Sequence, residues 1–320
     1  MRGTSLAYVF VALVSAVILP AGGTRDEGRF SFAIASDASR CAGPGRHDTP
    51  KDFRGVCEAI AKIGRGAFMI SPGDMEPPDE SKWTIEKYLG PHYPWYLAVG
   101  NHEKENPTFM AWMRAYNRGG NTLPNVVNAG PPGCRETTYS FDYKNCHFVI
   151  INEYYDGSSD TRLWGDIKHP LYRWLEADLS ATTKQHIFVI GHEPAYVRPD
   201  AGNGLLRHLG DSLDAHPQTR DSFWSLLGRK NVVAYITGHT HTYSAAKADG
   251  VWQLNTGHSR GKDERDAQST FVIVNVNGGE VAFDTYRDNG DGGPYLPRHH
   301  SVLVQGTPAL QPEPAGTPSP

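Results

Sequence analysis

Five short polar motifs recur in order along this chain, and each follows directly on an apolar run that is typical of a buried β-strand. They are Ser36-Asp37-Ala38-Ser39, Gly73-Asp74, Gly100-Asn101-His102-Glu103, Gly191-His192-Glu193-Pro194 and Gly238-His239-Thr240-His241. In open α/β sheets the binding crevice lies at the carboxyl ends of the strands. We therefore expect all five motifs to converge on one crevice.

The order of the expected elements predicts a mixed α/β domain with more than one sheet. Alternating or continuous apolar runs predict strands, and apolar residues at helical spacing predict helices. Strands are expected at 30–34, 67–70, 95–99, 187–190, 232–236, 251–254, 271–276 and 281–286, with a hairpin over 138–152. Helices are expected at 50–63, around 171–179 and around 223–227.

The two ends of the chain differ from the middle. Arg2 precedes an apolar stretch from Leu6 to Leu19, which small residues follow, as in a cleaved export signal. The stretch is shorter than the roughly 20 residues of a membrane-spanning helix, although an uncleaved anchor is the alternative. We expect a signal peptide over 1–23, one catalytic domain over 27–304 and a Pro-rich disordered tail over 305–320. The protein is thus predicted to be exported, secreted or periplasmic, without stable membrane insertion.

The composition limits the class of partner. The 320 residues are 39% hydrophobic, which permits a substantial core, and the formal net charge is -4. No block of lysine or arginine stands out. Long nucleic acids are therefore not expected as partners.

Four cysteines allow three disulfide pairings in an oxidising compartment. They are Cys41, Cys57, Cys134 and Cys146. Pairing of neighbours, Cys41 with Cys57 and Cys134 with Cys146, closes the shortest loops and is the prediction. Free, buried thiols are the alternative.

The motifs supply carboxylate, amide and imidazole ligands that suit two adjacent hard or borderline cations. The expected ligands are Asp37, Asp74, Asn101, His192, His239 and His241. Asp74 is expected to bridge both ions, because a carboxylate has enough lone pairs for two. Asp37 and His241 would complete the first site. The second site would be completed by Asn101, His192 and His239.

Paired cations of this kind hydrolyse phosphate esters, because they polarise phosphoryl oxygens and lower the pKa of bound water to about 7. A bridging hydroxide is expected to attack phosphorus in line. His102 follows Asn101 and is expected to donate a proton to the leaving oxygen or to stabilise the equatorial charge. Ligand imidazoles need acceptors that fix their tautomers, and Glu103, Glu193 and backbone carbonyls are the candidates.

The ordered motif set resembles the calcineurin-like metallophosphoesterases, a superfamily that includes purple acid phosphatases, protein phosphatases and cyclic-nucleotide phosphodiesterases. The resemblance extends from Phe30 to about Tyr286. It implies a four-layer α/β/β/α sandwich of two mixed β-sheets with a dinuclear site at one edge.

Two positions depart from the pattern of this family. Ser39 stands where many members have a histidine, and Pro77 stands where purple acid phosphatases have a tyrosine. The first metal is therefore expected to be bound weakly. Arg40 is a candidate contact for the substrate phosphate through its planar guanidinium. His258 lies in a loop that can approach the site, with an exposed loop histidine as the alternative.

We therefore expect an exported phosphoesterase that acts on small phosphate mono- or diesters with two divalent or trivalent Mn, Fe or Zn ions. One alternative is a phosphodiesterase of nucleotides or phospholipid headgroups. Aromatic residues that could line its pocket are Tyr154, Tyr155, Trp164 and Tyr196. The other alternative is an exported metal-binding protein without turnover.

Overall fold

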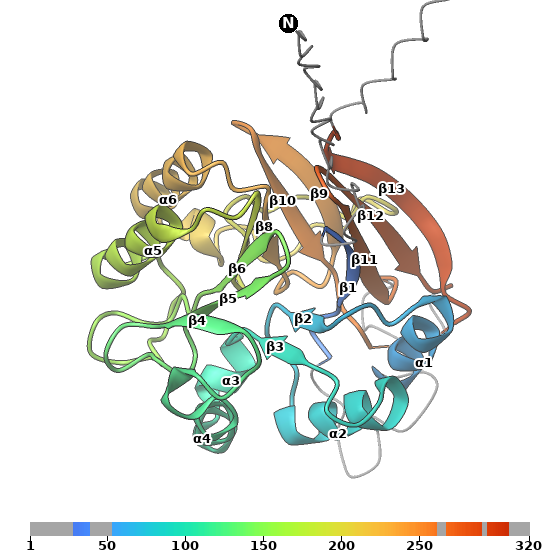
Figure 1. Cartoon of the computed structure of the whole chain (residues 1–320), viewed down its shortest axis with the longest axis horizontal. Helices are drawn as coiled ribbons and strands as arrows, with labels where there is room; N and C mark the ends of the chain where they lie inside the picture. The colour runs from blue at the N-terminus through green and yellow to red at the C-terminus, as the bar shows by residue number, and fades with distance from the viewer. Residues whose placement is uncertain (1–27, 39–52, 261–266, 290–292, 307–320) are drawn as a thin grey trace, which may run out of the picture.

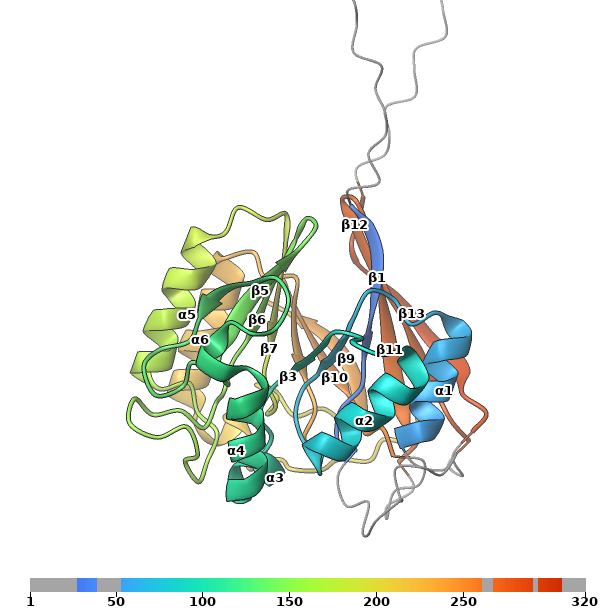
Figure 2. The ribbon, with the colours of Figure 1, turned by 60° about the horizontal axis from the view of Figure 1, so that its bottom comes forward.

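Two β-sheets face each other at the centre of the computed structural model, and helices cover their outer faces (Figures 1 and 2). The structure describes residues 28–38, 53–260, 267–289 and 293–306. The predicted four-layer α/β/β/α arrangement is confirmed.

The first sheet has six strands in the order β13-β12-β11-β1-β2-β3. Strands β1, β2 and β3 are parallel, whereas β11, β12 and β13 continue the sheet antiparallel from β1. The strands are β1 (Arg29–Ile34), β2 (Met69–Ser71), β3 (Trp95–Leu97), β11 (Thr270–Asn277), β12 (Glu280–Arg287) and β13 (Leu296–Val304).

The second sheet has seven strands in the order β4-β5-β6-β7-β8-β10-β9, of which β6, β7, β8 and β10 are parallel. The strands are β4 (Val126–Ala129), β5 (Tyr139–Tyr143), β6 (Cys146–Ile150), β7 (His186–Ile190), β8 (Ala234–Thr237), β9 (Tyr243–Ala248) and β10 (Val251–Thr256). The expected hairpin is the pair β5 and β6.

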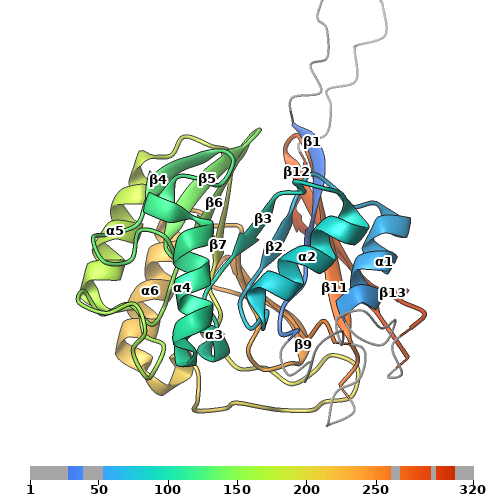
Figure 3. The same ribbon diagram turned by 90° about the horizontal axis from the view of Figure 1, so that it is seen from below.

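Helices on the two outer faces complete the layers (Figure 3). The helices α1 (Phe53–Ile63) and α2 (Pro78–Leu89) cover the first sheet. The helices α3 (Asn101–Glu105) and α4 (Pro107–Tyr116) follow β3, and Met110 and Met113 of α4 lie in the same core as α1 and α2. Those on the side of the second sheet are α5 (His169–Ala181) and α6 (Pro217–Arg229). Short 3-10 turns lie at Arg118–Gly120 and Leu213–Ala215.

Aromatic rings fill the space between the sheets. Phe148 of the second sheet meets Phe32 of the first sheet edge-on, with ring centroids 5.2 Å apart. It also stacks on Phe188 at 5.2 Å and meets Phe68 at 5.3 Å. These fully or almost fully buried rings contribute large apolar areas and fix the spacing of the sheets.

Some elements carry little signal in the sequence and were not expected. Strand β13 pairs with β12 at the edge of the sheet as described, and much of it is polar and exposed. Helix α4 begins at Pro107, and the Asn106 side chain accepts a hydrogen bond from the Thr108 N–H at 3.0 Å. Asn106 and Pro107 mark the start of this helix, and its buried residues Met110 and Met113 lie in the same core as the partly buried Trp112 and Tyr116.

The predicted disulfide between Cys134 and Cys146 is wrong, since both thiols are free and buried. Cys146 faces the core between the sheets, whereas Cys134 belongs to the core between the second sheet and its helices. Burial raises the pKa of both thiols to about 12. Cys57 is also free and buried, and Cys41 lies outside the described residues.

Two further features concern the surface. Among the described residues, no helix is both long and apolar enough to span a bilayer, and the predicted signal segment lies outside them.

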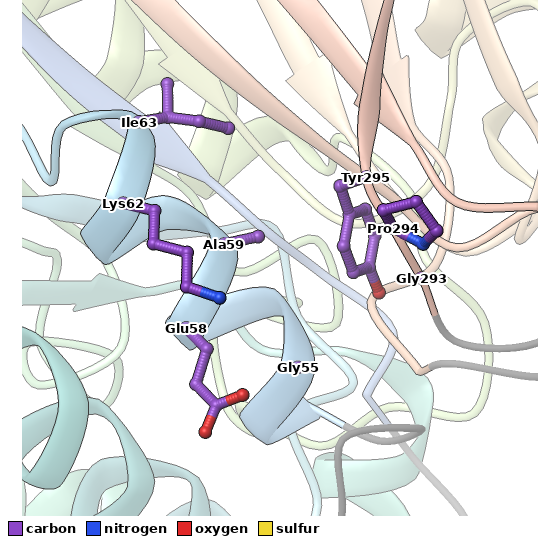
Figure 4. Close-up of a pocket in the computed structure, with 8 residues that line it drawn as sticks. All are labelled: Gly55, Glu58, Ala59, Lys62, Ile63, Gly293, Pro294 and Tyr295. Carbon is purple, nitrogen blue, oxygen red and sulfur yellow. The ribbon is translucent and has the colours of Figure 1, made fainter.

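A pocket of about 240 Å³ lies between α1 and the segment at 293–295, where Tyr295 and Pro294 face the side chains of the helix (Figure 4). None of its lining residues belongs to the five motifs.

Candidate metal centre

The five motifs meet at the carboxyl ends of parallel strands from both sheets. Asp37, Asp74 and Asn101 follow β1, β2 and β3, while His192 follows β7 and the two histidines at 239 and 241 follow β8. Four of the side chains stand on left-handed backbone, which non-glycine residues rarely adopt and which is common at functional sites. They are Asp37 (φ 53°), Asp74 (φ 56°), His239 (φ 69°) and His241 (φ 58°).

Three predicted ligands of the second site converge on one point. The Asn101 Oδ1 lies 3.0 Å from His192 Nε2 and 3.1 Å from His239 Nδ1. The outward nitrogen of each ring faces a backbone carbonyl: His192 Nδ1 lies 2.7 Å from the Pro72 oxygen, and His239 Nε2 lies 2.8 Å from the Asp211 oxygen. Each ring therefore donates its N–H outward and turns a lone pair inward.

This arrangement fits a metal ion. A neutral imidazole has one N–H, so the inward nitrogens and the amide oxygen are all acceptors and a cation satisfies all of them. Asp74 adds a carboxylate, with Oδ2 at 3.5 Å from His192 Nε2. Without a cation, rotation of the Asn101 amide would let its Nδ2 donate to both rings. Nitrogen, amide and carboxylate donors together suit Mn, Fe or Zn.

Burial keeps these imidazoles neutral, as metal ligands must be. It lowers the pKa of His192 to about 3, and repulsion by the charges of His102 and His208 acts in the same direction. Burial likewise lowers the pKa of His239 to about 3.

The first site holds two buried carboxylates and one imidazole. Single ligand atoms of Asp37, Asp74 and His241 all lie within 4.8 Å of one another. Burial raises the pKa of Asp37 well above its usual range, and the charge of Asp74 raises it further. Two carboxylates so close together favour a nearby positive charge.

Arginines contact the imidazole of the first site. Arg260 Nη2 and Arg207 Nη1 each lie 2.8 Å from His241 Nδ1. A guanidinium only donates, so Nδ1 faces two donors, and Arg260 Nη2 also lies 3.5 Å from Nε2. That nitrogen lies 3.5 Å from Asp37 Oδ1. The role of His241 as a metal ligand stays a prediction.

A loop anchored at Asp200 carries Arg207 to this place. The Asp200 carboxylate accepts two hydrogen bonds from the guanidinium of Arg287 in β12, at 3.0 and 2.7 Å. It also accepts the N–H groups of Gly202 at 2.8 Å and Tyr243 at 2.9 Å. Both side chains of the ion pair are buried, and the pair ties this loop to the first sheet.

His102 stands beside the centre with a partner that the sequence motifs did not single out. Its Nδ1 lies 2.9 Å from Glu76 Oε1, and its Nε2 lies 3.8 Å from Asp74 Oδ2. The hydrogen bond to Glu76 raises the pKa of His102 to about 9 against the opposing effect of burial. Glu76 stands two residues after Asp74, and that proximity is its only signal in the sequence.

Backbone carbonyls, rather than the two predicted glutamates, fix the tautomers of His192 and His239. Glu103 instead accepts the N–H groups of Asp74, Met75 and Gly100, at 2.9, 2.6 and 2.9 Å. Glu193 accepts the N–H of Gly165 at 3.2 Å. The Glu103 carboxylate thus joins the loops that carry Asp74 and Asn101.

The predicted substrate contacts fall in different surroundings. Arg40 lies outside the described residues. His258 is fully buried with Nε2 at 3.0 Å from the Ala267 oxygen, so the alternative of an exposed loop histidine is wrong. Its contact with substrate stays a prediction. Of the aromatic residues, Tyr154 and Tyr155 are buried, whereas Trp164 is 60% exposed.

Comparison with known proteins identifies the family. The family described as calcineurin-like phosphoesterase matches residues 31–243, which is more than half of the chain. The chain belongs to the calcineurin-like phosphoesterase family. The predicted family is thereby confirmed, and with it the assignment to a family of phosphoric ester hydrolases.

Relatives of this calcineurin-like phosphoesterase include purple acid phosphatases. Purple acid phosphatase 18 of Arabidopsis thaliana is 27% identical over 213 residues, 60% of this chain and 40% of that protein. The structure of a purple acid phosphatase from yellow lupin (Lupinus luteus) seeds has a TM-score of 0.58 at 13% identity, over 88% of this chain and 57% of the other.

A further similar structure is that of GAP50 of Plasmodium, titled the anchor in the inner membrane complex. It has a TM-score of 0.54 at 12% identity, over 88% of this chain and 90% of the other. At such identities the structures show a shared fold. The chain spans less than two thirds of the Arabidopsis and lupin proteins.

Proposed function

We propose that this chain is a metal-dependent phosphoesterase that hydrolyses small phosphate mono- or diesters. The observation that carries the proposal is the convergence of two inward imidazole lone pairs on the Asn101 amide, beside the Asp74 carboxylate. A divalent ion held by Asp74, Asn101, His192 and His239 would supply a Lewis acid for the phosphoryl group.

His102 is the proposed acid. Its side chain is 23% exposed, so it is accessible from solvent beside the buried ligands. With a pKa raised to about 9 by Glu76, the ring is an imidazolium at neutral pH. It can therefore give a proton from Nε2 to the leaving oxygen, or stabilise negative charge on the phosphoryl group. Glu76 holds Nδ1 and orients the ring.

A pocket of about 440 Å³ beside the centre supports a small substrate. Asp211, whose carbonyl accepts the His239 N–H, lines this pocket together with Trp164 and His216. The exposed indole of Trp164 offers a flat apolar surface to an aromatic leaving group. This observation favours a nucleotide phosphodiesterase as the second candidate function.

Export also belongs to the proposal. It is supported by the short apolar stretch and small residues within 1–23, with the catalytic domain over 27–304. Expression of the full chain with its own N-terminus, followed by N-terminal sequencing of the secreted product, tests it. A mature protein that begins near residue 24 is expected, and a product retained with Met1 intact would contradict export.

The test of activity compares a chromogenic phosphate monoester with the matching diester, using protein reconstituted with manganese. His239→Ala is expected to lower kcat/KM by at least about 100-fold, because even residues outside the ligand set cost 10–100-fold at metal sites. His300→Ala is the matched control, since that side chain is exposed on β13. Turnover that is equal in wild type and His239→Ala would refute the proposal.

A further inference from the structure

A buried glutamate outside the five motifs contacts the loop that carries His192. Glu153 follows β6 and is only 1% exposed. Its Oε2 accepts the backbone N–H of His192 at 3.1 Å and that of Glu193 at 2.8 Å. Hydrogen bonds favour a narrow range of angles, so two consecutive N–H groups on one oxygen fix the direction of the chain there. The glutamate therefore holds the backbone from which the His192 ring projects.

The other oxygen of this carboxylate contacts strand β8. The Tyr235 hydroxyl donates to Glu153 Oε1 and also lies 2.8 Å from the Glu193 carbonyl oxygen. Tyr235 is fully buried in β8, the strand that His239 follows. One side chain thus joins the end of β6, the loop after β7 and the strand β8. The last two of these elements carry the two imidazoles of the proposed metal site.

The glycine before His192 is required by the same contact. A Cβ at Gly191 would overlap the Glu153 carboxylate and would lie 2.5 Å from the Tyr235 hydroxyl. Gly191 does not have the left-handed backbone that favours glycine, so lack of space is the reason for this residue. The motif and the glutamate are therefore packed as one unit.

A second buried glutamate has the corresponding place in the other half of the centre. The Glu103 carboxylate accepts the N–H groups of Asp74 and Gly100, and so holds the loops after β2 and β3. Each half of the centre thus has one buried carboxylate that binds the backbone of the loops carrying the ligands. Groups that orient metal ligands in this way typically account for 10–100-fold in metal affinity.

We infer that Glu153 is a positioning residue of the metal centre, which acts on the bound ion through His192. The acceptor at the position of Oε2 is what this role requires. A glutamine can supply it, because its amide oxygen can accept both N–H groups while its Nε2 donates to the Tyr235 hydroxyl oxygen. That hydroxyl can then donate to the Glu193 carbonyl. The inference rests on the proposed function for the presence of the metal site.

Amide hydrogen exchange of the protein without added metal tests the contact itself. The N–H groups of His192 and Glu193 are expected to be protected in wild type and in Glu153→Gln. In Glu153→Met, which removes both acceptor oxygens, they should exchange at least about 10-fold faster, because buried donors that lose an acceptor are destabilised. Equal protection in Glu153→Met and wild type would refute the inference.

Titration with Mn²⁺ tests the effect on the metal. Glu153→Met is expected to weaken binding at least about 10-fold, whereas Glu153→Gln should bind like wild type. Asp178→Leu is the matched control, since it removes a buried carboxylate whose partners Ser140 and Asn128 lie in β5 and β4. Its Mn²⁺ affinity should not change. An unchanged affinity in folded Glu153→Met, or a loss in Glu153→Gln equal to that in Glu153→Met, would overturn the inference.

A second genetic background shows whether Glu153 acts through His192. In His192→Ala protein, Glu153→Met should no longer change the affinity for Mn²⁺, because the ligand that it positions is missing. A loss as large as in the wild-type background would mean general damage and would refute the role. If Glu153→Met does not fold, as thermal unfolding would reveal, Gly191→Ala displaces the carboxylate instead. Folded Gly191→Ala with the wild-type affinity would then contradict the inference.

These results are separable from those of the activity test. Wild type that binds Mn²⁺ without turnover would refute the proposed function and leave the role of Glu153 standing. Turnover with an affinity that does not depend on Glu153 would do the reverse. Wild type that binds no Mn²⁺ would refute both.

Discussion

Removal of the buried charge at Asp200 is expected to destabilise the fold strongly. In Asp200→Asn the Nδ2 group takes the place of one carboxylate oxygen. If that oxygen is Oδ2, the Arg287 Nη2 and the Tyr243 N–H, at 2.7 and 2.9 Å, both lose their acceptor. Each unsatisfied buried donor costs about 1–3 kcal/mol, which gives about 2–6 kcal/mol. Breaking a buried ion pair by removing one partner costs about 3–5 kcal/mol, in agreement.

Urea unfolding at pH 7 of wild type, Asp200→Asn, Arg287→Met and the double variant measures this cost. We expect each single variant to lower the free energy of unfolding by about 3–5 kcal/mol. The double variant should be destabilised by less than the sum of these two losses, because it leaves no uncompensated charge. Single variants that cost under about 1 kcal/mol, or costs that simply add, would show that the ion pair does not hold the loop.

The dependence on pH gives the same prediction an independent check. Burial alone would raise the pKa of Asp200, but the guanidinium of Arg287 and the backbone N–H groups lower it overall. Because the folded pKa lies below the unfolded value of about 3.9, the stabilisation is present above about pH 4. It is lost as the pH falls through the folded pKa. The difference in the free energy of unfolding between wild type and Asp200→Asn should therefore be largest at pH 7 and become smaller below pH 4. A difference that does not change with pH would refute the reasoning.

Three further predictions follow from single contacts. Gly100→Ala would place a Cβ 2.1 Å from the Asp74 Oδ1, so Asp74 must move and the affinity for Mn²⁺ measured by titration should fall at least about 10-fold. Phe148→Ala should cost about 3–5 kcal/mol in urea unfolding, because it opens a cavity between the sheets. Burial lowers the pKa of His147, but hydrogen bonds to Asp178 at 2.9 Å and to a second aspartate raise it overall. Asp178→Asn should thus lower the pKa of His147 in an NMR titration. The protonated ring contributes its full stabilisation below about pH 6.5, and this contribution should be lost as the pH rises through the folded pKa.

Matched substitutions separate these effects from general damage. Gly228→Ala adds a Cβ that meets only an ordinary contact at 3.5 Å, and it should leave Mn²⁺ affinity unchanged. Ile63→Ala removes a side chain that is 41% exposed and should cost much less than Phe148→Ala. If Gly228→Ala weakened Mn²⁺ binding as much as Gly100→Ala, or Ile63→Ala cost as much stability as Phe148→Ala, the local contacts would not be the cause of these losses. An unaltered His147 pKa in Asp178→Asn would refute the third prediction.

The parts of the site that the sequence predicted are those set by local patterns. Apolar runs mark the strands, and polar residues directly after them mark the edge where Asp37, Asp74 and His192 meet. No such sequence pattern identifies the residues that other loops bring to the site. Arg207 and Arg260 reach His241 across 34 and 19 residues of chain, and their role depends on how the loops fold back over the strand ends.

The remaining misses have physical causes of the same kind. Strand β13 is polar because it lies at an edge, so apolar alternation could not reveal it. The pairing of Cys134 with Cys146 failed because spacing along the chain does not say on which side of a sheet a thiol lies. The left-handed backbone at Asp74 became visible only with the fold itself.

The ligands of the proposed metal follow strands of both sheets, so one bound ion adds a link between two layers that already meet through apolar rings and a few polar contacts. Thermodynamic linkage then makes the metal a cross-link whose strength is set by its concentration. An ion at 100 times its dissociation constant would stabilise the folded chain by about 2.7 kcal/mol. The melting temperature of the protein should therefore report the free metal concentration of the compartment in which it works.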